Sequence, residues 1–227
     1  MASRARRFAA AAALSVLTTL PCCFGGECTP KAKGQDEKPA GVAFHFGTHT
    51  ARTTLTFESE TSLETIHGIT HTMSGTATLD FGKGEGSAEL KVPVKAMDTG
   101  IEKRNEHLQS ETWLDAEKNP DIVFKAKSLK RTKTDEGTKR ETWAYEGEIT
   151  IHGVTKELKG EATVLRIPAD AAKKLGEGDW VKVKTKFDVT IADFGIKVPD
   201  FAAAKVSPTW SVGVDVFGTT VMPSGDK

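Results

Sequence analysis

Alternation of apolar and polar residues, repeated in short runs from Val42 onward, constrains this fold more than any other feature of the chain. Successive side chains of a β-strand point to opposite faces, so alternation is typical of strands with one buried face. About eight such runs follow one another through short connections, which favours antiparallel pairing. Because a flat sheet of this size would expose its apolar face and its edges, we predict an all-β, antiparallel barrel over residues 42–220, followed by a tail at 221–227. The most regular run carries Val181, Val183, Thr185, Phe187, Val189 and Ile191 on one face.

A short motif occurs twice in the predicted barrel. The segment Ile66-His67-Gly68-Ile69-Thr70 matches Ile151-His152-Gly153-Val154-Thr155. Glycine adopts positive φ freely, and histidine tolerates it better than most residues, so we predict a hairpin turn at each His-Gly pair. Both histidines are interpreted as turn residues rather than as chemical groups.

Three segments interrupt the strand pattern. Residues 101–110, which follow the turn Asp98-Thr99-Gly100, are predicted to form a short helix. Residues 168–174 are a second short helix candidate, because proline stands in the first turn and Gly176 follows the end. Residues 130–140 are predicted to be a polar loop. The helices are expected at the barrel ends.

Small residues recur on the apolar face beyond each His-Gly pair, at Gly75 and Ala77 and again at Gly160 and Ala162. An eight-stranded barrel is either filled by its own side chains or wide enough for one small ligand. The small residues therefore indicate either a cavity or the bends and bulges that barrels also need, and the sequence leaves both readings open. The walls of a cavity would be Leu, Val, Ile, Phe and Trp side chains, which suit a hydrocarbon better than a sugar or nucleotide. At ~0.8 kcal/mol per buried CH₂, a chain of about 20 carbons would have ample driving force.

The N-terminal region predicts export. A basic stretch with Arg4, Arg6 and Arg7 precedes an apolar run from Phe8 to Leu20, which is too short to span a bilayer. We therefore expect a signal peptide at residues 1–22, a flexible linker at 23–41 and a location in the periplasm or cell envelope.

All three cysteines, Cys22, Cys23 and Cys28, lie in this leader, so no disulfide can staple the barrel. The segment Leu20-Pro21-Cys22-Cys23 is a loose version of a bacterial lipoprotein box. Two outcomes remain open: acylation of Cys23, which would anchor the protein to a membrane, or simple cleavage.

Charge and motif content exclude several classes of function. The formal net charge is zero, which argues against a nucleic-acid partner. His45 and His49, like His67 and His71, are four residues apart, and on a strand this spacing separates two side chains by about 13 Å, so no metal site is expected. No nucleophile stands in a recognisable catalytic motif, so we predict a protein that is not an enzyme and needs no cofactor.

Several motifs together resemble the YceI family. They are Val94 followed by Thr99-Gly100, Arg104 and His107-Leu108; Asn119-Pro120 with Ile122 and Phe124; Gly147 with the segment 149–156; and Phe194-Gly195-Ile196. The resemblance covers essentially all of residues 42–218. It implies a lipocalin-like antiparallel barrel, exported to the periplasm of bacteria, that holds a polyisoprenoid or another long-chain amphiphile. A structural barrel with a filled interior and, less favoured, an envelope enzyme are the alternatives, and a dimer is compatible with the sequence.

The expected ligand-binding residues are inward-facing apolar and small residues, together with two polar residues of the predicted 101–110 helix. Arg104 and His107 would hold this helix over one barrel end, where they would also meet a ligand head group. The full set is Phe57, Met73, Gly75, Ala77, Leu90, Arg104, His107, Phe124, Trp143, Tyr145, Gly160, Ala162 and Phe187.

Overall fold

The computed structural model describes residues 41–47 and 52–222. All described residues belong to one compact unit. The predicted signal peptide, nearly all of the predicted linker and the Cys23 lipidation site lie outside the described residues.

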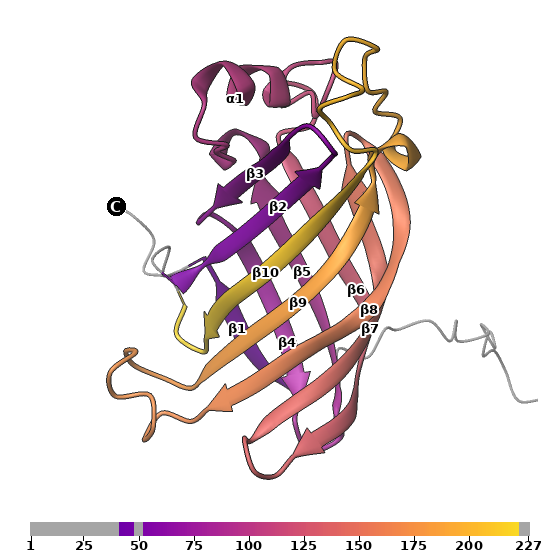
Figure 1. Ribbon diagram of the computed structural model, residues 1–227. Helices are drawn as coiled ribbons and strands as arrows, with labels where there is room; N and C mark the ends of the chain where they lie inside the picture. The colour runs from indigo at the N-terminus through magenta and orange to yellow at the C-terminus, as the bar shows by residue number, and fades with distance from the viewer. Residues whose placement is uncertain (1–40, 48–51, 223–227) are drawn as a thin grey trace, which may run out of the picture. The chain divides into compact units, whose positions relative to one another are not determined.

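Ten strands form one antiparallel sheet whose order is β1-β4-β5-β6-β7-β8-β9-β10-β2-β3. An additional pairing of β1 with β10, at His45–Thr219 and Phe46–Gly218, closes eight of these strands into a barrel (Figure 1). The predicted barrel of about eight antiparallel strands is confirmed. The strands are β1 (Val42–Phe46), β2 (Thr54–Glu60), β3 (Thr65–Thr70), β4 (Ser74–Asp80), β5 (Glu85–Pro93), β6 (Asp121–Asp135), β7 (Arg140–Ile151), β8 (Val154–Ile167), β9 (Trp180–Thr190) and β10 (Thr209–Thr219).

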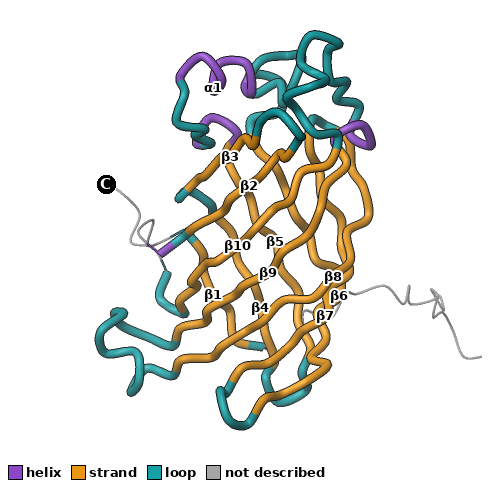
Figure 2. The backbone as a smooth tube through the Cα atoms, in the orientation of Figure 1, coloured by secondary structure: helices purple, strands orange, loops and turns teal. Residues whose placement is uncertain are grey.

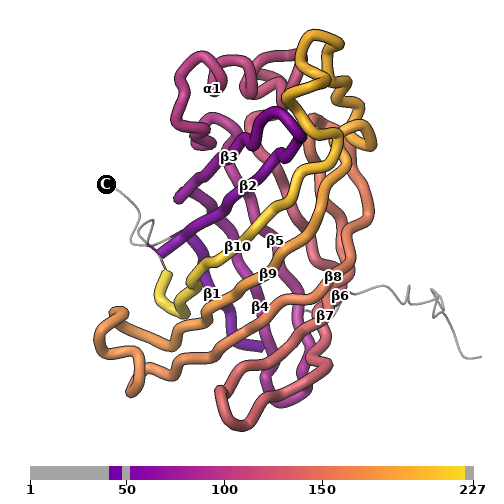
Figure 3. The backbone as a smooth tube through the Cα atoms, in the orientation of Figure 1, coloured from indigo at the N-terminus to yellow at the C-terminus, as the bar shows by residue number. Residues whose placement is uncertain are grey.

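The first two strands share one edge of the last strand. β10 pairs with β2 through residues 211–215 and with β1 through residues 218 and 219. The colours of Figure 3 show the N-terminal strands beside the C-terminal strand. The hairpin β2–β3 thus extends the barrel wall. On the outer edge of β3, Ile69 forms an isolated bridge with Asp98, and their backbone groups exchange two hydrogen bonds of 2.8 Å.

The second His-Gly pair forms the predicted turn, but the first does not. His152 and Gly153 have φ angles of 50° and 74° and connect β7 to β8, as a two-residue hairpin turn requires. His67 and Gly68 instead lie inside β3, so that prediction is wrong. The physical reason is the residue opposite: Phe57 pairs with Gly68, and its ring lies where a side chain of residue 68 would be.

Helix α1 (Glu102–Gln109) and two short 3₁₀ helices, η2 (Val94–Ala96) and η3 (Ile191–Phe194), lie at one end of the barrel (Figure 2). Helix α1 confirms the first predicted helix, and η2 and η3 follow strands β5 and β9. The helix predicted over residues 168–174 is wrong. This segment forms successive turns, in which the Pro168 carbonyl accepts hydrogen bonds from the amides of Ala171 and Ala172. So short a segment gains too few hydrogen bonds to offset helix nucleation.

The predicted polar loop at residues 130–140 is also wrong for most of its length. β6 continues to Asp135 and β7 begins at Arg140, so only residues 136–139 form the turn. The Asp135 carboxylate accepts hydrogen bonds from the amides of Gly137 and Thr138, which fixes the turn. Polar residues occur on both faces here, which hid the strand alternation.

The buried apolar residues form two separate clusters. The first lies toward the end covered by α1 and contains Leu108, Leu114 and Phe194. The second lies toward the other end and contains Phe44, Trp143 and Val181. Members of both clusters line the interior cavity.

Candidate functional site

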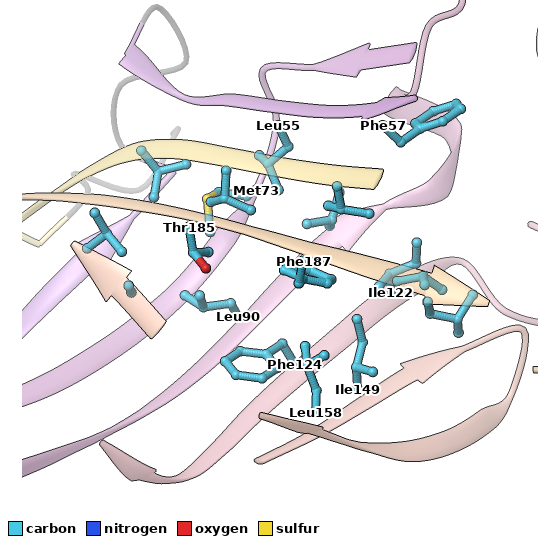
Figure 4. A pocket seen from close by; sticks show the side chains of 18 of the residues that line it. Leu55, Phe57, Met73, Leu90, Ile122, Phe124, Ile149, Leu158, Thr185 and Phe187 are labelled. Carbon is cyan, nitrogen blue, oxygen red and sulfur yellow. The ribbon is translucent and has the colours of Figure 1, made fainter. Parts of the chain in front are cut away.

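A cavity of about 220 Å³ lies inside the barrel. Residues of all ten strands line it, together with residues of the loops at the α1 end (Figure 4). Most of the lining residues are Leu, Val, Ile, Phe and Met, and the rest are Ala, Thr, Trp and Tyr. Among the lining residues there is no Asp, Glu, Lys, Arg, His or Cys. Nine of the residues expected from the sequence line the cavity: Phe57, Met73, Ala77, Leu90, Phe124, Trp143, Tyr145, Ala162 and Phe187.

Two of the expected small residues are outside the cavity lining. Gly75 has a φ of 136°, and a Cβ atom there would collide with the Glu89 carbonyl of the neighbouring strand. This glycine therefore permits close approach of β4 and β5. A Cβ atom on Gly160 would lie 2.5 Å from the Tyr145 hydroxyl oxygen. Gly160 thus makes room for an aromatic ring rather than for a ligand, whereas Ala77 and Ala162 do border the cavity.

Arg104 and His107 lie on α1 and do not line the cavity either. The Arg104 guanidinium forms a 2.6 Å ion pair with Glu64, in the turn between β2 and β3. The pair is about one-third exposed on each side, so solvent screens it. It ties α1 to the hairpin. The His107 side chain is exposed, and its carbonyl accepts hydrogen bonds from the Ser110 amide and hydroxyl.

The sequence set omitted several residues that the structure places in the wall. The sequence pattern could have identified them, because each lies on the same face of a strand as a residue that was in the expected set. Thr185 is the most informative, since it stands in the Val-rich face of β9 and brings a hydroxyl to the wall. The omitted residues with labelled side chains in Figure 4 are Leu55, Ile122, Ile149, Leu158 and Thr185.

The Tyr145 and Thr185 hydroxyls form a small polar spot in the barrel wall, although the surface of the cavity is almost wholly apolar. Their oxygens are 3.4 Å apart, and the Thr185 hydroxyl donates a 2.8 Å hydrogen bond to the Glu161 carbonyl. Burial raises the pKa of the Tyr145 phenol, an effect that the Thr185 contact partly offsets. The phenol therefore stays protonated at neutral pH and remains a hydrogen-bond donor.

Fully buried side chains belong to the cavity wall at both ends. At the α1 end the lining residues Leu114, Phe194 and Ile196 are at most 4% exposed. At the other end Trp143 is 1% exposed, and its indole N–H donates a 2.8 Å hydrogen bond to the Glu141 carboxylate.

A partly buried ion pair lies beside Trp143 at this second end of the barrel. The Glu141 carboxylate also forms a 2.9 Å ion pair with Arg131, whose guanidinium donates to the Phe81 carbonyl. The Phe81 ring packs edge-on against Trp143, with centroids 5.8 Å apart.

Three histidines of the described chain make contacts on the barrel wall. His45 contacts the Thr76 hydroxyl, His71 the Thr53 carbonyl, and His67 forms an exposed pair with Glu58. No group of three or more His, Cys, Asp or Glu residues that could hold a metal occurs within residues 41–47 and 52–222. No helix in these ranges has the length and apolar character needed to cross a membrane.

Solved structures share this architecture. BcnA from Burkholderia cenocepacia superposes with a TM-score of 0.59 at 16% identity, covering 75% of this chain and 99% of its own. A polyisoprenoid-binding domain from Saccharophagus degradans gives a TM-score of 0.58 at 16% identity, covering 79% and 98%. A YceI protein from Campylobacter jejuni gives 0.54 at 20% identity, covering 67% and 83%. At these identities the comparison establishes the fold, a lipocalin-like YceI barrel.

Sequence comparison gives the family. A UPF0312 protein from Pseudomonas savastanoi pv. phaseolicola is 30% identical over 139 residues, and one from Pseudomonas putida F1 is 31% identical over 140. Each alignment covers 59% of this chain and only 65% of the relative's length. The YceI-like domain matches residues 46–217, which is nearly the whole described barrel, and the chain therefore belongs to the YceI-like family.

Proposed function

We propose that this protein binds a long-chain isoprenoid or a similar amphiphilic lipid inside its barrel, without converting it chemically. The observation that carries the proposal is the cavity of about 220 Å³ whose walls lack charged side chains. Such a space rejects sugars and nucleotides, because their polar groups would lose hydrogen bonds to water without replacement. The similarity to a polyisoprenoid-binding domain supports the same ligand class.

The absence of titratable carboxyl, imidazole, amine and thiol groups from the described lining supports binding rather than catalysis. General acid–base chemistry needs such a group within hydrogen-bond reach of the reacting atom. The only titratable group in the wall is the Tyr145 phenol, and burial raises its pKa further from neutrality.

The size of the cavity bears on the length of the ligand. At about 30 Å³ per water-sized group, roughly seven methylene-sized groups fill 220 Å³. A chain of about 20 carbons would contribute ample hydrophobic free energy at ~0.8 kcal/mol per CH₂. Its full accommodation requires flexible lining side chains such as Met73 to move, or part of the chain to leave the cavity.

We also propose that the protein is exported and acts in the periplasm or cell envelope. The support is the basic and apolar leader of residues 1–20. Mass spectrometry of the mature N-terminus tests this: a diacylglyceryl mass on Cys23 identifies a membrane-anchored lipoprotein, an unmodified shortened N-terminus identifies a soluble exported protein, and an intact Met1 contradicts export.

The binding proposal is tested by native mass spectrometry and organic extraction of the purified protein. We expect a co-purified isoprenoid or fatty amphiphile, or uptake of an added one. The variant Ala88→Phe, which fills the cavity, should lose this uptake. Ser87→Phe places the same ring on the outer face of β5 and serves as the matched control. A ligand-free mass with no uptake of any added lipid would identify a structural barrel instead.

A further inference from the structure

The barrel wall is not hydrogen-bonded along its whole circumference. β8 and β9 pair only between residues 162–167 and 180–185. Toward the α1 end, residues 154–161 of β8 and 186–190 of β9 share no ladder pair, although each strand remains paired with its other neighbour, β7 or β10. Eight residues of extended strand correspond to about 26 Å. We call this unpaired stretch the β8–β9 seam.

The seam is bounded at both ends by side-chain hydrogen bonds. At its foot, where the ladder stops, the Thr185 hydroxyl donates to the Glu161 carbonyl. At its other limit, the His152 ring nitrogen lies 3.2 Å from the Phe194 carbonyl. Between them Leu158 and Phe187 face the cavity from opposite sides of the seam and are only partly buried. The stretch of wall without ladder hydrogen bonds between β8 and β9 therefore borders the cavity directly.

The polar spot of the wall lies at the foot of this seam. Tyr145 pairs with Gly160 across the β7–β8 ladder, and its ring extends over this glycine to reach Thr185 on β9. Thr185 pairs with Ala162, the last pair before the seam begins. Figure 4 shows the Thr185 oxygen among the carbon side chains of the wall, near Phe187.

The Tyr145 hydroxyl lacks a strong partner in the described structure. Its contact with the Thr185 oxygen is 3.4 Å, whereas O–H···O hydrogen bonds are usually about 2.5–3.0 Å. The Thr185 hydrogen is directed to the Glu161 carbonyl. A donor with so weak a partner, next to an apolar space, gains free energy when an acceptor arrives.

We propose that a lipid enters the barrel sideways through the β8–β9 seam and that the Tyr145 and Thr185 hydroxyls then hold an uncharged oxygen of its head group. This inference rests on the proposed lipid binding and names the ligand class more closely. A hydroxyl, carbonyl or amide oxygen can accept from Tyr145. A carboxylate or phosphate would lose more hydration than two hydroxyls replace, because no cationic side chain lines the described cavity. The tail fills the cavity, and the head group stays near water at the seam.

The head-group site is tested with dodecanol and dodecane, which differ by one hydroxyl. Each competes with the fluorescent apolar probe N-phenyl-1-naphthylamine for the full-length protein. Tyr145→Phe keeps the ring and removes the hydroxyl, so the affinity for dodecanol should fall roughly 5- to 10-fold, as expected for one hydrogen bond. The affinity for dodecane should change less than about twofold.

Two further variants check this result. Thr185→Val should also lower the affinity for dodecanol more than the affinity for dodecane. Thr155→Val removes a hydroxyl that contacts Thr150 on the outer face of the β7–β8 ladder, and it should change neither affinity. Equal effects of Tyr145→Phe on dodecanol and dodecane, or no effect, would overturn the head-group site. Failure of the wild-type protein to bind either compound would instead overturn the proposed function.

The route of entry is tested by cross-linking the seam. Lys159→Cys and Asp188→Cys place two thiols on the outer faces of β8 and β9, and a short bis-maleimide joins them after the three native cysteines have been replaced by serine. We expect the probe to associate and dissociate at least about tenfold more slowly, with little change in affinity, because a closed entrance slows both directions equally.

The matched control is Thr163→Cys with Lys184→Cys, which joins the same two strands at a residue pair of the intact ladder. This cross-link should leave both rates unchanged. Unchanged rates after cross-linking of the seam would exclude it as the entrance.

Discussion

Tyr145 and Gly160 are directly opposed on β7 and β8, and the tyrosine ring fills the space in which a side chain of residue 160 would stand. A Cβ atom added to Gly160 would lie 2.5 Å from the phenol oxygen and 2.7 Å from the ring carbon that bears it. The glycine and the aromatic ring thus form one packing unit. Phe57 with Gly68, and Phe46 with Gly218, repeat the arrangement at two other cross-strand pairs.

The first prediction concerns this packing. Gly160→Ala should lower the free energy of unfolding by about 1–3 kcal/mol, because the added methyl group displaces the Tyr145 ring from its position. Urea denaturation measures the change. In a Tyr145→Leu background the same substitution should cost markedly less, since the smaller side chain leaves room for the methyl group. Equal costs in the two backgrounds would show that the strain lies elsewhere.

These glycines show where sequence reasoning succeeds and where it stops. Alternation predicted the barrel, and nine of the residues expected to bind a ligand line the cavity, because successive side chains of a strand point to opposite faces. The two His-Gly pairs look alike in the sequence, yet only Gly153 is in a turn. Gly68 differs because Phe57 stands opposite, and that pairing joins two strands whose register the sequence did not reveal.

The β8–β9 seam is a second feature that alternation cannot predict. Both strands keep their pattern beyond Ala162 and Thr185, where their ladder ends, because each is still held by its other neighbour. Which edges pair is decided by the shape of the whole barrel and not by either strand alone. The positions of the Tyr145 and Thr185 hydroxyls relative to the seam therefore required the structure.

The second prediction concerns helix α1. Arg104→Ala with His107→Ala removes the 2.6 Å pair with Glu64 and should lower the free energy of unfolding by at most about 1 kcal/mol, because the pair is partly exposed. The affinity for dodecanol should stay within about twofold, since neither residue lines the cavity. Urea denaturation and the competition assay measure the two quantities. The head-group role expected from the sequence stays a prediction: a selective loss of affinity for an anionic amphiphile such as dodecanoate would support it.

The third prediction concerns acid stability. Hydrogen bonds from Asn105 and Gly100 lower the pKa of Asp98, those from the Thr138 hydroxyl and amide lower the pKa of Asp135, and the bond from Arg166 lowers the pKa of Asp179. The ordinary value in an unfolded chain is about 3.9. At pH values between the folded and the unfolded pKa, the unfolded chain binds more protons than the folded protein. The contribution of these carboxylates to the free energy of unfolding is therefore complete above about pH 4, and it is lost as the pH falls through the folded pKa values.

The matched variant is Asp98→Asn, whose amide oxygen can still accept from Gly100 but does not titrate in this range. The urea midpoint of the wild-type protein should fall more between pH 7 and pH 3 than that of Asp98→Asn. Adding Asp135→Asn and Asp179→Asn should flatten the pH dependence further. Parallel curves for wild type and variants would show that these three carboxylates do not contribute to acid unfolding.

The fourth prediction concerns ligand length. Each additional CH₂ of a straight-chain alcohol should strengthen binding up to about fourfold, the equivalent of ~0.8 kcal/mol, while it still enters the cavity. Since 220 Å³ holds roughly seven such groups, the gain should fall below about twofold per CH₂ beyond about seven carbons. Competition measurements from butanol to hexadecanol give the slope.

A change of cavity volume should change the chain length at which the gain in affinity per CH₂ falls. We call this chain length the break. Ala162 lines the cavity opposite Trp143, so Ala162→Leu should shift the break to shorter alcohols. Thr163→Leu puts the same side chain on the outer face of β8 and should leave the break in place. A constant gain through hexadecanol, with no effect of Ala162→Leu, would mean that the tail lies on another surface. If only the inward substitution shortens the chain length at which the gain in affinity falls, the tail lies inside the barrel. In a bounded apolar space, the affinity gained from an added methylene depends on the volume of each wall residue. On an open surface it does not.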